Sequence, residues 1–302
     1  MQTGGMTCVA RTPRLIAGMV VAVAAGPAPA GAAQLIGRNA TNVRLSIAND
    51  GKALVRYRAN GREQHVLAWG AVNAIAPSRA RTQVSFRVDY SGGWRSFHRR
   101  PSAFSGTCGA YDGPKLHWLV AACRAPDGSY WAVQTWQRAL PNYGLPASTA
   151  QRAYELRLSH WTGPLPVLEL YVGWTQRHYH TLFGRFTYRG QGVYGFRSNA
   201  QGAPLDSFGR LLYVDTRDSE YGVGWARENS FLTHRPGGTF CYAFFRHADR
   251  PSGMGARYRG TMMSPGVLPD AYWEGVPPAT YDAAYDEEMT TVRHSFADPN
   301  CR

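Results

Sequence analysis

The chain has few lysines and no motif of known enzymatic chemistry. Only Lys52 and Lys115 are lysines, so almost all of its 33 basic residues are arginines. The sequence contains no G-x-S-x-G elbow and no phosphate-binding glycine loop, which removes two common catalytic signatures. The segment Asp89–Gly93 (DYSGG) has a tyrosine between Asp and Ser and so departs from the serine-protease nucleophile loop. The sequence therefore names no reaction outright.

Cysteines are also few, and none lies in a C-x-x-C pair, so zinc or thioredoxin-type redox chemistry is not indicated. Apart from Cys8, near the N-terminus, the cysteines are Cys108, Cys123, Cys241 and Cys301. An even number in an exported chain predicts disulfides, and four cysteines allow three pairings. We favour the local one, Cys108 with Cys123 and Cys241 with Cys301.

The apolar run Leu15–Ala25 is too short to span a bilayer. Arg11 and Arg14 precede it, and a small-residue tail that includes Ala30-Gly-Ala32 follows it. This order is typical of a secretory signal peptide over residues 1–33, with a mature start near Ala33 or Gln34. We therefore expect a secreted protein, extracellular or associated with the cell surface, without a membrane span.

Acidic residues are outnumbered, 20 against 33 basic residues, and the formal net charge is +13. Removing residues 1–33 removes two arginines and no acid, which leaves about +11. One explanation of the arginine bias, and the one we favour as its main cause, is a GC-rich, bacterial genome. Guanidinium groups also pair bidentately with carboxylates and phosphates, which favours a polyanion as partner. Nucleic acid is not expected, because the arginines are scattered and form no basic run or recognition helix.

Helical periodicity is nearly absent, and glycine turns separate short alternating runs. Asn49-Asp-Gly51 and Asn60-Gly61 lie between such runs and predict an antiparallel meander from residue 43. Further alternating runs predict an all-β chain with a β-sandwich or jelly-roll-like region and one short C-terminal helix over Thr280–Arg293. The turn-rich segment Pro141–Ser148 predicts a division into an N-terminal β region, 34–140, and a C-terminal sandwich-like region, 150–302, whose tail a disulfide holds.

Two histidines form the most suggestive local group. In a strand, His178 and His180 project from the same face and are able to bind one metal ion. Further ligands would come from His160, His234 or Glu169. The alternative is that both are exposed or packed histidines without a metal, and we favour it because no third ligand is near in sequence. No other cofactor is expected.

Acidic residues gather near aromatic residues between 206 and 228, within the glycine- and aromatic-rich stretch Leu182–Phe245. A glycosidase needs two carboxylates, one acid and one base or nucleophile, and aromatic rings that hold the sugar. A polysaccharide lyase needs a tyrosine or histidine base beside an arginine. The catalytic candidates for a hydrolase or lyase are Asp215, Asp218, Glu220, Glu228 and Tyr188.

The aromatic residues that are not core suggest a binding surface beside arginines. The expected ligand-binding residues are Trp174, Arg177, Tyr179, Arg185, Tyr194 and Trp225, and Trp94 and Trp131 are further candidates for exposed rings. This surface predicts a monomer that binds an acidic or neutral polysaccharide or a cell-wall polymer. The alternative is the secreted carbohydrate-active enzyme. A flat arginine and aromatic face favours the binding protein, whereas a deep cleft with two carboxylates favours the enzyme.

Overall fold

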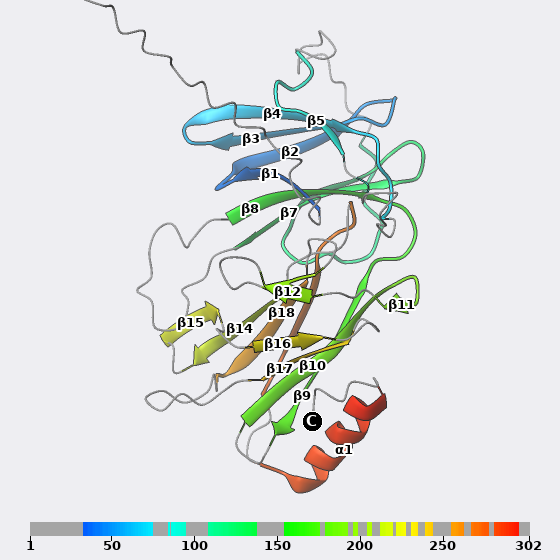
Figure 1. The fold of residues 1–302 in the computed structure, drawn as a ribbon. Helices are drawn as coiled ribbons and strands as arrows, with labels where there is room; N and C mark the ends of the chain where they lie inside the picture. The colour runs from blue at the N-terminus through cyan, green and yellow to red at the C-terminus, as the bar shows by residue number, and fades with distance from the viewer. Residues whose placement is uncertain are drawn as a thin grey trace, which may run out of the picture.

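The all-β prediction is confirmed by the computed structural model, in which antiparallel strands precede one short helix (Figure 1). The structure describes residues 33–74, 84, 86–94, 108–137, 154–175, 179–192, 196–198, 204–206, 212–219, 222–227, 231–234, 239–243, 255–262, 267–277 and 281–295. Within these ranges, no helix is long and apolar enough to cross a membrane.

Two four-stranded antiparallel sheets form an N-terminal sandwich, in the upper part of Figure 1. One sheet is the predicted meander, in the order β2 (Thr41–Ile47), β3 (Ala53–Ala59), β4 (Arg62–Trp69), β5 (Arg87–Asp89). The other has the order β1 (Gln34–Arg38), β8 (Tyr154–Trp161), β7 (Tyr130–Gln137), β6 (Leu119–Arg124). The β3–β4 turn is tight because Asn60 and Gly61 both take left-handed φ angles, 50° and 73°.

The sandwich core follows from the alternation of side chains along the strands. Val55 and Tyr57 of β3 point inward and pack in one cluster with Ile36, Trp131 and Leu158. Arg56 and Arg58 alternate with them and therefore lie on the outer face of the meander sheet. Tyr57 also donates a hydrogen bond from its hydroxyl to the Ile36 carbonyl at 2.7 Å, which satisfies its one polar group inside the core.

The C-terminal half contains two larger sheets and a two-stranded ribbon. The first sheet comprises β9 (Val167–Thr175), β10 (Tyr179–Tyr188), β11 (Gln191–Gly192), β16 (Phe231–His234) and β17 (Thr239–Ala243). The second has the order β15 (Gly222–Arg227), β14 (Leu212–Ser219), β18 (Arg257–Met262), β19 (Ala271–Gly275), and the ribbon pairs β12 (Phe196–Ser198) with β13 (Pro204–Asp206). Leu170 and Phe186 of the first sheet pack with Val214 and Tyr258 of the second.

The single described helix, α1 (Ala283–Ser295), covers β9 at the bottom of Figure 1. It begins three residues later than the predicted start because the Asp282 carboxylate accepts hydrogen bonds from the amides of Ala284 and Tyr285, at 2.9 and 3.3 Å, and so caps the helix. Met289 and Tyr285 pack toward Phe183, and the Tyr285 hydroxyl donates to the Val172 carbonyl at 2.6 Å.

Strand pairing crosses the turn-rich segment at 141–148. β8 lies beyond that segment, yet it pairs with β1 and β7 and completes the N-terminal sandwich. The two halves also make direct contacts, since the His160 amide donates to the Val267 carbonyl at 2.9 Å and the Asp270 amide donates to Gln134 Oε1 at 3.2 Å. The sandwich therefore extends to Trp161, and the division of the chain into domains stays a prediction.

The disulfide between Cys108 and Cys123 is present, with Cα atoms 5.1 Å apart. It fastens the segment before β6 to the end of that strand, where Gly109 and Arg124 also exchange backbone hydrogen bonds. The second predicted pair is not tested, because Cys301 lies outside the described residues.

Candidate anion-binding site

Asp215, the first catalytic candidate, lies in β14 and is fully buried. Its Oδ1 accepts a hydrogen bond from Arg227 Nε at 2.6 Å, and its Oδ2 accepts from Arg259 Nε at 3.0 Å and from Arg259 Nη2 at 2.8 Å. Both carboxylate oxygens are therefore occupied by guanidinium donors. Such an arrangement holds the side chain as the centre of an ion network.

Aromatic rings cover the two arginines of this network. The Arg227 guanidinium lies 3.8 Å from the Tyr213 ring centre, and that of Arg259 lies 4.2 Å from the Trp225 ring centre. Trp118 and Trp136 of the N-terminal half stack on each other and lie within cation–π range of Arg259 and Arg227, respectively. The network therefore joins the two halves, and Trp225 is engaged in it.

The remaining catalytic candidates are not gathered around Asp215 by any described contact. The Asp218 carboxylate is exposed, accepts from the Gly224 amide at 2.7 Å and lies 3.3 Å from Arg217 Nε. Tyr188 is half-buried, and burial raises the pKa of its hydroxyl. Glu220 and Glu228 lie outside the described residues.

The predicted binding surface is likewise dispersed. Trp131 and Trp174 are buried, so neither presents an open ring to a ligand, because both fill the interior of their half. Arg185 is exposed and forms an ion pair with Glu169 across β9 and β10. Arg177 and Tyr194 lie outside the described residues, and only the backbone of Tyr179 is described, in β10.

The metal prediction stays a prediction. His178 lies outside the described residues, and only the backbone of His180, in β10, and of His234, in β16, is described. Within the described residues, no group of three or more His, Cys, Asp or Glu side chains could hold a metal ion. His160, offered as a third ligand, is buried against the Trp131 ring in the N-terminal sandwich.

His160 has well-defined hydrogen-bond partners. Its Nδ1 lies 2.9 Å from the Ala71 carbonyl, and its Nε2 lies 2.8 Å from Ser129 Oγ, which donates to Asp127 Oδ1 at 2.6 Å. The serine hydrogen bond lowers the pKa of Asp127, whereas burial lowers the pKa of His160. Ser129 is itself buried, so the chain of hydrogen bonds from Asp127 through Ser129 to His160 supports the loop at residues 70–71 and does not present a nucleophile.

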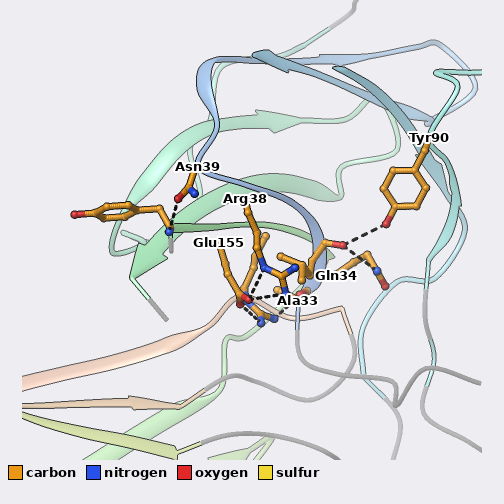
Figure 2. A network of polar contacts seen from close by, with 9 residues as sticks. Ala33, Gln34, Arg38, Asn39, Tyr90 and Glu155 are labelled. Atoms are coloured by element: carbon orange, nitrogen blue, oxygen red, sulfur yellow. Dashed lines mark hydrogen bonds and ion pairs between the residues drawn. The ribbon is translucent and has the colours of Figure 1, made fainter. Parts of the chain in front are cut away.

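A second buried carboxylate shows the same structural use of arginine (Figure 2). Glu155 of β8 is fully buried, and its oxygens lie 2.7 Å from Arg157 Nη2 and 3.3 Å from Arg38 Nη2. Arg157 also donates to the Ala33 carbonyl at 3.0 Å. These contacts hold both ends of β1 against β8, so these arginines stabilise the fold.

Three arginines on the outer face of the meander sheet, Arg44, Arg56 and Arg58, have no carboxylate partner among the described residues, unlike the arginines of the ion networks. They line a cavity of about 610 Å³, and the cavity-lining residues are Asn42, Arg44, Arg56, Tyr57, Arg58, Gly61 and Glu63. Arg44 and Arg58 are exposed and Arg56 is half-buried. Within the described part of the chain, none of these guanidinium groups forms an ion pair with a carboxylate. We call this site the arginine cavity.

Strand register explains why positive charge gathers in the arginine cavity. Arg44 of β2 lies directly opposite Arg56 of β3, and Arg56 in turn lies opposite His65 of β4. Like charges in directly opposed positions destabilise a sheet. In addition, Arg56 Nε is buried and has no hydrogen-bond partner among the described residues. A bound anion would remove both costs, since it pairs with the guanidinium groups and accepts the unused hydrogen bond.

The sequence placed Arg56 and Arg58 on the outer face, but it gave no sign of the arginine cavity. The Arg44–Arg56 pairing depends on a register shift in β2 between Thr41 and Arg44, where Asn42 takes a left-handed φ of 51°. An asparagine close to a strand start is a weak signal of such a bulge. The arginine cavity was therefore missed at the sequence level.

No family model, curated protein or solved structure matches this chain.

Proposed function

We propose that the protein binds an acidic polysaccharide or a related anionic polymer of the cell envelope or extracellular space, and that the arginine cavity is its anion site. The observation that carries this proposal is the convergence of Arg44, Arg56 and Arg58 on one cavity without a carboxylate partner among the described residues. Arginine suits this role because its planar fork binds carboxylate, sulfate or phosphate groups with two hydrogen bonds at once.

The size and lining of the arginine cavity also suit a sugar. A volume of about 610 Å³ lies within the range of ligand cavities and accommodates a saccharide unit with its charged group. Asn42 and Glu63 on its wall add an amide and a carboxylate, which are able to bind hydroxyl groups. The arginine cavity therefore combines anion contacts with contacts that a bare inorganic anion does not need.

Exposed aromatic rings lie in the turn that follows β5 of the same sheet, where the Tyr90 hydroxyl donates to the Leu35 carbonyl of the other sheet at 3.4 Å. Ser91 forms an isolated bridge with His65, and the turn around Ser91 carries Tyr90 and Trp94, whose residues are 59% and 54% exposed. Aromatic faces of this kind are able to pack against sugar rings, and Asp89 holds the turn by accepting from the Ser91 and Gly93 amides at 2.9 and 3.1 Å. This supports a polymer that extends from the arginine cavity toward the turn. Export through the predicted signal peptide over residues 1–33 would bring the protein to such a polymer.

The test is a binding panel of acidic and neutral polysaccharides at about 50 mM and about 500 mM salt, since screening weakens contacts between exposed charges. We expect the wild-type protein to bind acidic polymers at low salt and to lose about tenfold in affinity at high salt. The double variant Arg44→Gln/Arg56→Gln should lose most of this binding.

A matched control separates the arginine cavity from net charge. The double variant Arg124→Gln/Arg217→Gln removes the same charge from two exposed arginines that already pair with Asp112 and Asp218. It should bind like the wild type. Equal losses in both double variants would show that net charge alone attracts the polymer, and no binding of any acidic polymer at low salt would refute the proposal.

A further inference from the structure

Glu63, the one carboxylate on the described wall of the arginine cavity, also has a histidine partner. His65 Nε2 lies 3.4 Å from Glu63 Oε1, and both residues belong to β4. Across the strand pair, Glu63 lies opposite Arg58, and His65 lies opposite Arg56. Glu63 can therefore pair with the histidine on its own strand or turn toward the arginine on the next strand.

Resting on the proposed function, we propose that His65 and Glu63 make anion binding in the arginine cavity pH-dependent, with tighter binding at acidic pH. Histidine is the side chain whose charge ordinarily changes between pH 5 and 8. A protonated His65 holds Glu63 in an ion pair and adds a positive charge to the row that contains Arg56. A neutral His65 releases Glu63, whose negative charge then repels the ligand and competes with it for Arg58.

Other charged groups lie around His65 on the neighbouring strands. Arg56 on β3 and Arg44 on β2 share its row. Glu63 lies beside it on its own strand. Asp89 of β5 lies opposite Leu67, two residues further along β4, and its carboxylate is occupied by Ser91 and Gly93. A bound anion would add a further favourable charge, so protonation of His65 and anion binding should strengthen each other.

The experiment measures the affinity of dextran sulfate oligosaccharide at about pH 5.5 and pH 8, since sulfate esters keep their charge over this range. We expect the wild type to bind about three- to tenfold more tightly at the lower pH, as suits one charge change on the residue opposite Arg56 in a solvated site. His65→Gln should bind with nearly the same affinity at both pH values. Glu63→Gln should keep only the part of the pH dependence that the charge of His65 itself supplies, and it should bind at the higher pH at least as tightly as the wild type binds at the lower pH.

Two further variants complete the design. His65→Lys keeps a positive charge at both pH values and should bind tightly at both, while His117→Gln removes an exposed histidine outside the arginine cavity and should keep the wild-type ratio. Thermal melts at both pH values show whether each variant is folded. Absence of binding by the wild type at both pH values would refute the proposed function itself. Binding whose pH ratio is unchanged in His65→Gln and Glu63→Gln would refute only this inference.

Discussion

The Asp215 network gives the sharpest test of a structural role against a catalytic one. Asp215→Asn keeps the size of the side chain but leaves Arg227 and Arg259 without their shared anion. The side chains of these arginines are only 12% and 9% exposed, so neither can recover full hydration. Removing one partner from a buried ion network typically costs about 3–5 kcal/mol. We therefore expect the free energy of unfolding to fall by about that amount and the melting temperature to fall by roughly 10 °C.

The control is Asp218→Asn on the same strand. The Asp218 side chain is 42% exposed, and an asparagine oxygen can still accept from the Gly224 amide, so the cost should be about 0.5 kcal/mol. Urea unfolding monitored by tryptophan fluorescence measures the stability of both variants, because Trp118 and Trp225 lie next to the Asp215 network. If Asp215 were a catalytic carboxylate in an open cleft, Asp215→Asn would keep its stability. Equal stability of the two variants would therefore refute the structural reading of Asp215.

Three further predictions concern stability. Burial lowers the pKa of His160 below its ordinary 6.5, so the unfolded chain binds a proton on this histidine more readily than the folded chain does. The free energy of unfolding should therefore fall as the pH falls from about 7 toward 5. His160→Gln should flatten this dependence in thermal melts recorded at a series of pH values. Cys108→Ser/Cys123→Ser opens a loop with a sequence separation of 15 and should lower the free energy of unfolding by about 3 kcal/mol, and any further loss on adding a reductant would report the second predicted pair, Cys241 with Cys301. Gly184→Ala would place a methyl group against the Glu169 carbonyl on β9 and should cost about 1–3 kcal/mol by urea unfolding, whereas an unchanged midpoint would show that the β9–β10 pair can separate without cost.

Local signals in the sequence predicted the meander well. The Asn60-Gly61 turn depends on two adjacent left-handed residues, which neighbouring positions alone specify. The Cys108–Cys123 disulfide was predicted for the same reason, since the two cysteines flank one short excursion of the chain.

Long-range partners could not be predicted in this way. Asp215 and Arg259 are 44 residues apart, and only the pairing of β14 with β18 brings them together. The acidic residues near Asp215 suggested an enzyme site. Their nearness in sequence does not show that one of them, Asp215, is buried between two arginines. Similarly, Trp131 resembles an exposed binding residue in sequence, yet its ring fills the interior of the sandwich.

The arginine cavity could be predicted only in part. Alternation along β3 placed Arg56 and Arg58 outward, but the opposition of Arg44 and Arg56 depends on the shifted register of β2. A slip of one residue would turn Arg44 toward the core face, and the arginine cavity would lose one of its three guanidinium groups.

The most direct test of the arginine cavity is a crystal structure of the protein grown with selenate, whose selenium atom is located by its anomalous scattering. Selenate carries the charge and shape of sulfate and therefore reports where a sulfated or phosphorylated group binds. We predict a selenate within hydrogen-bond distance of Arg56 Nε, flanked by the guanidinium groups of Arg44 and Arg58. A selenate bound elsewhere with the arginine cavity empty, or an arginine cavity filled by a carboxylate of the protein itself, would show that the arginine cavity is not an anion site.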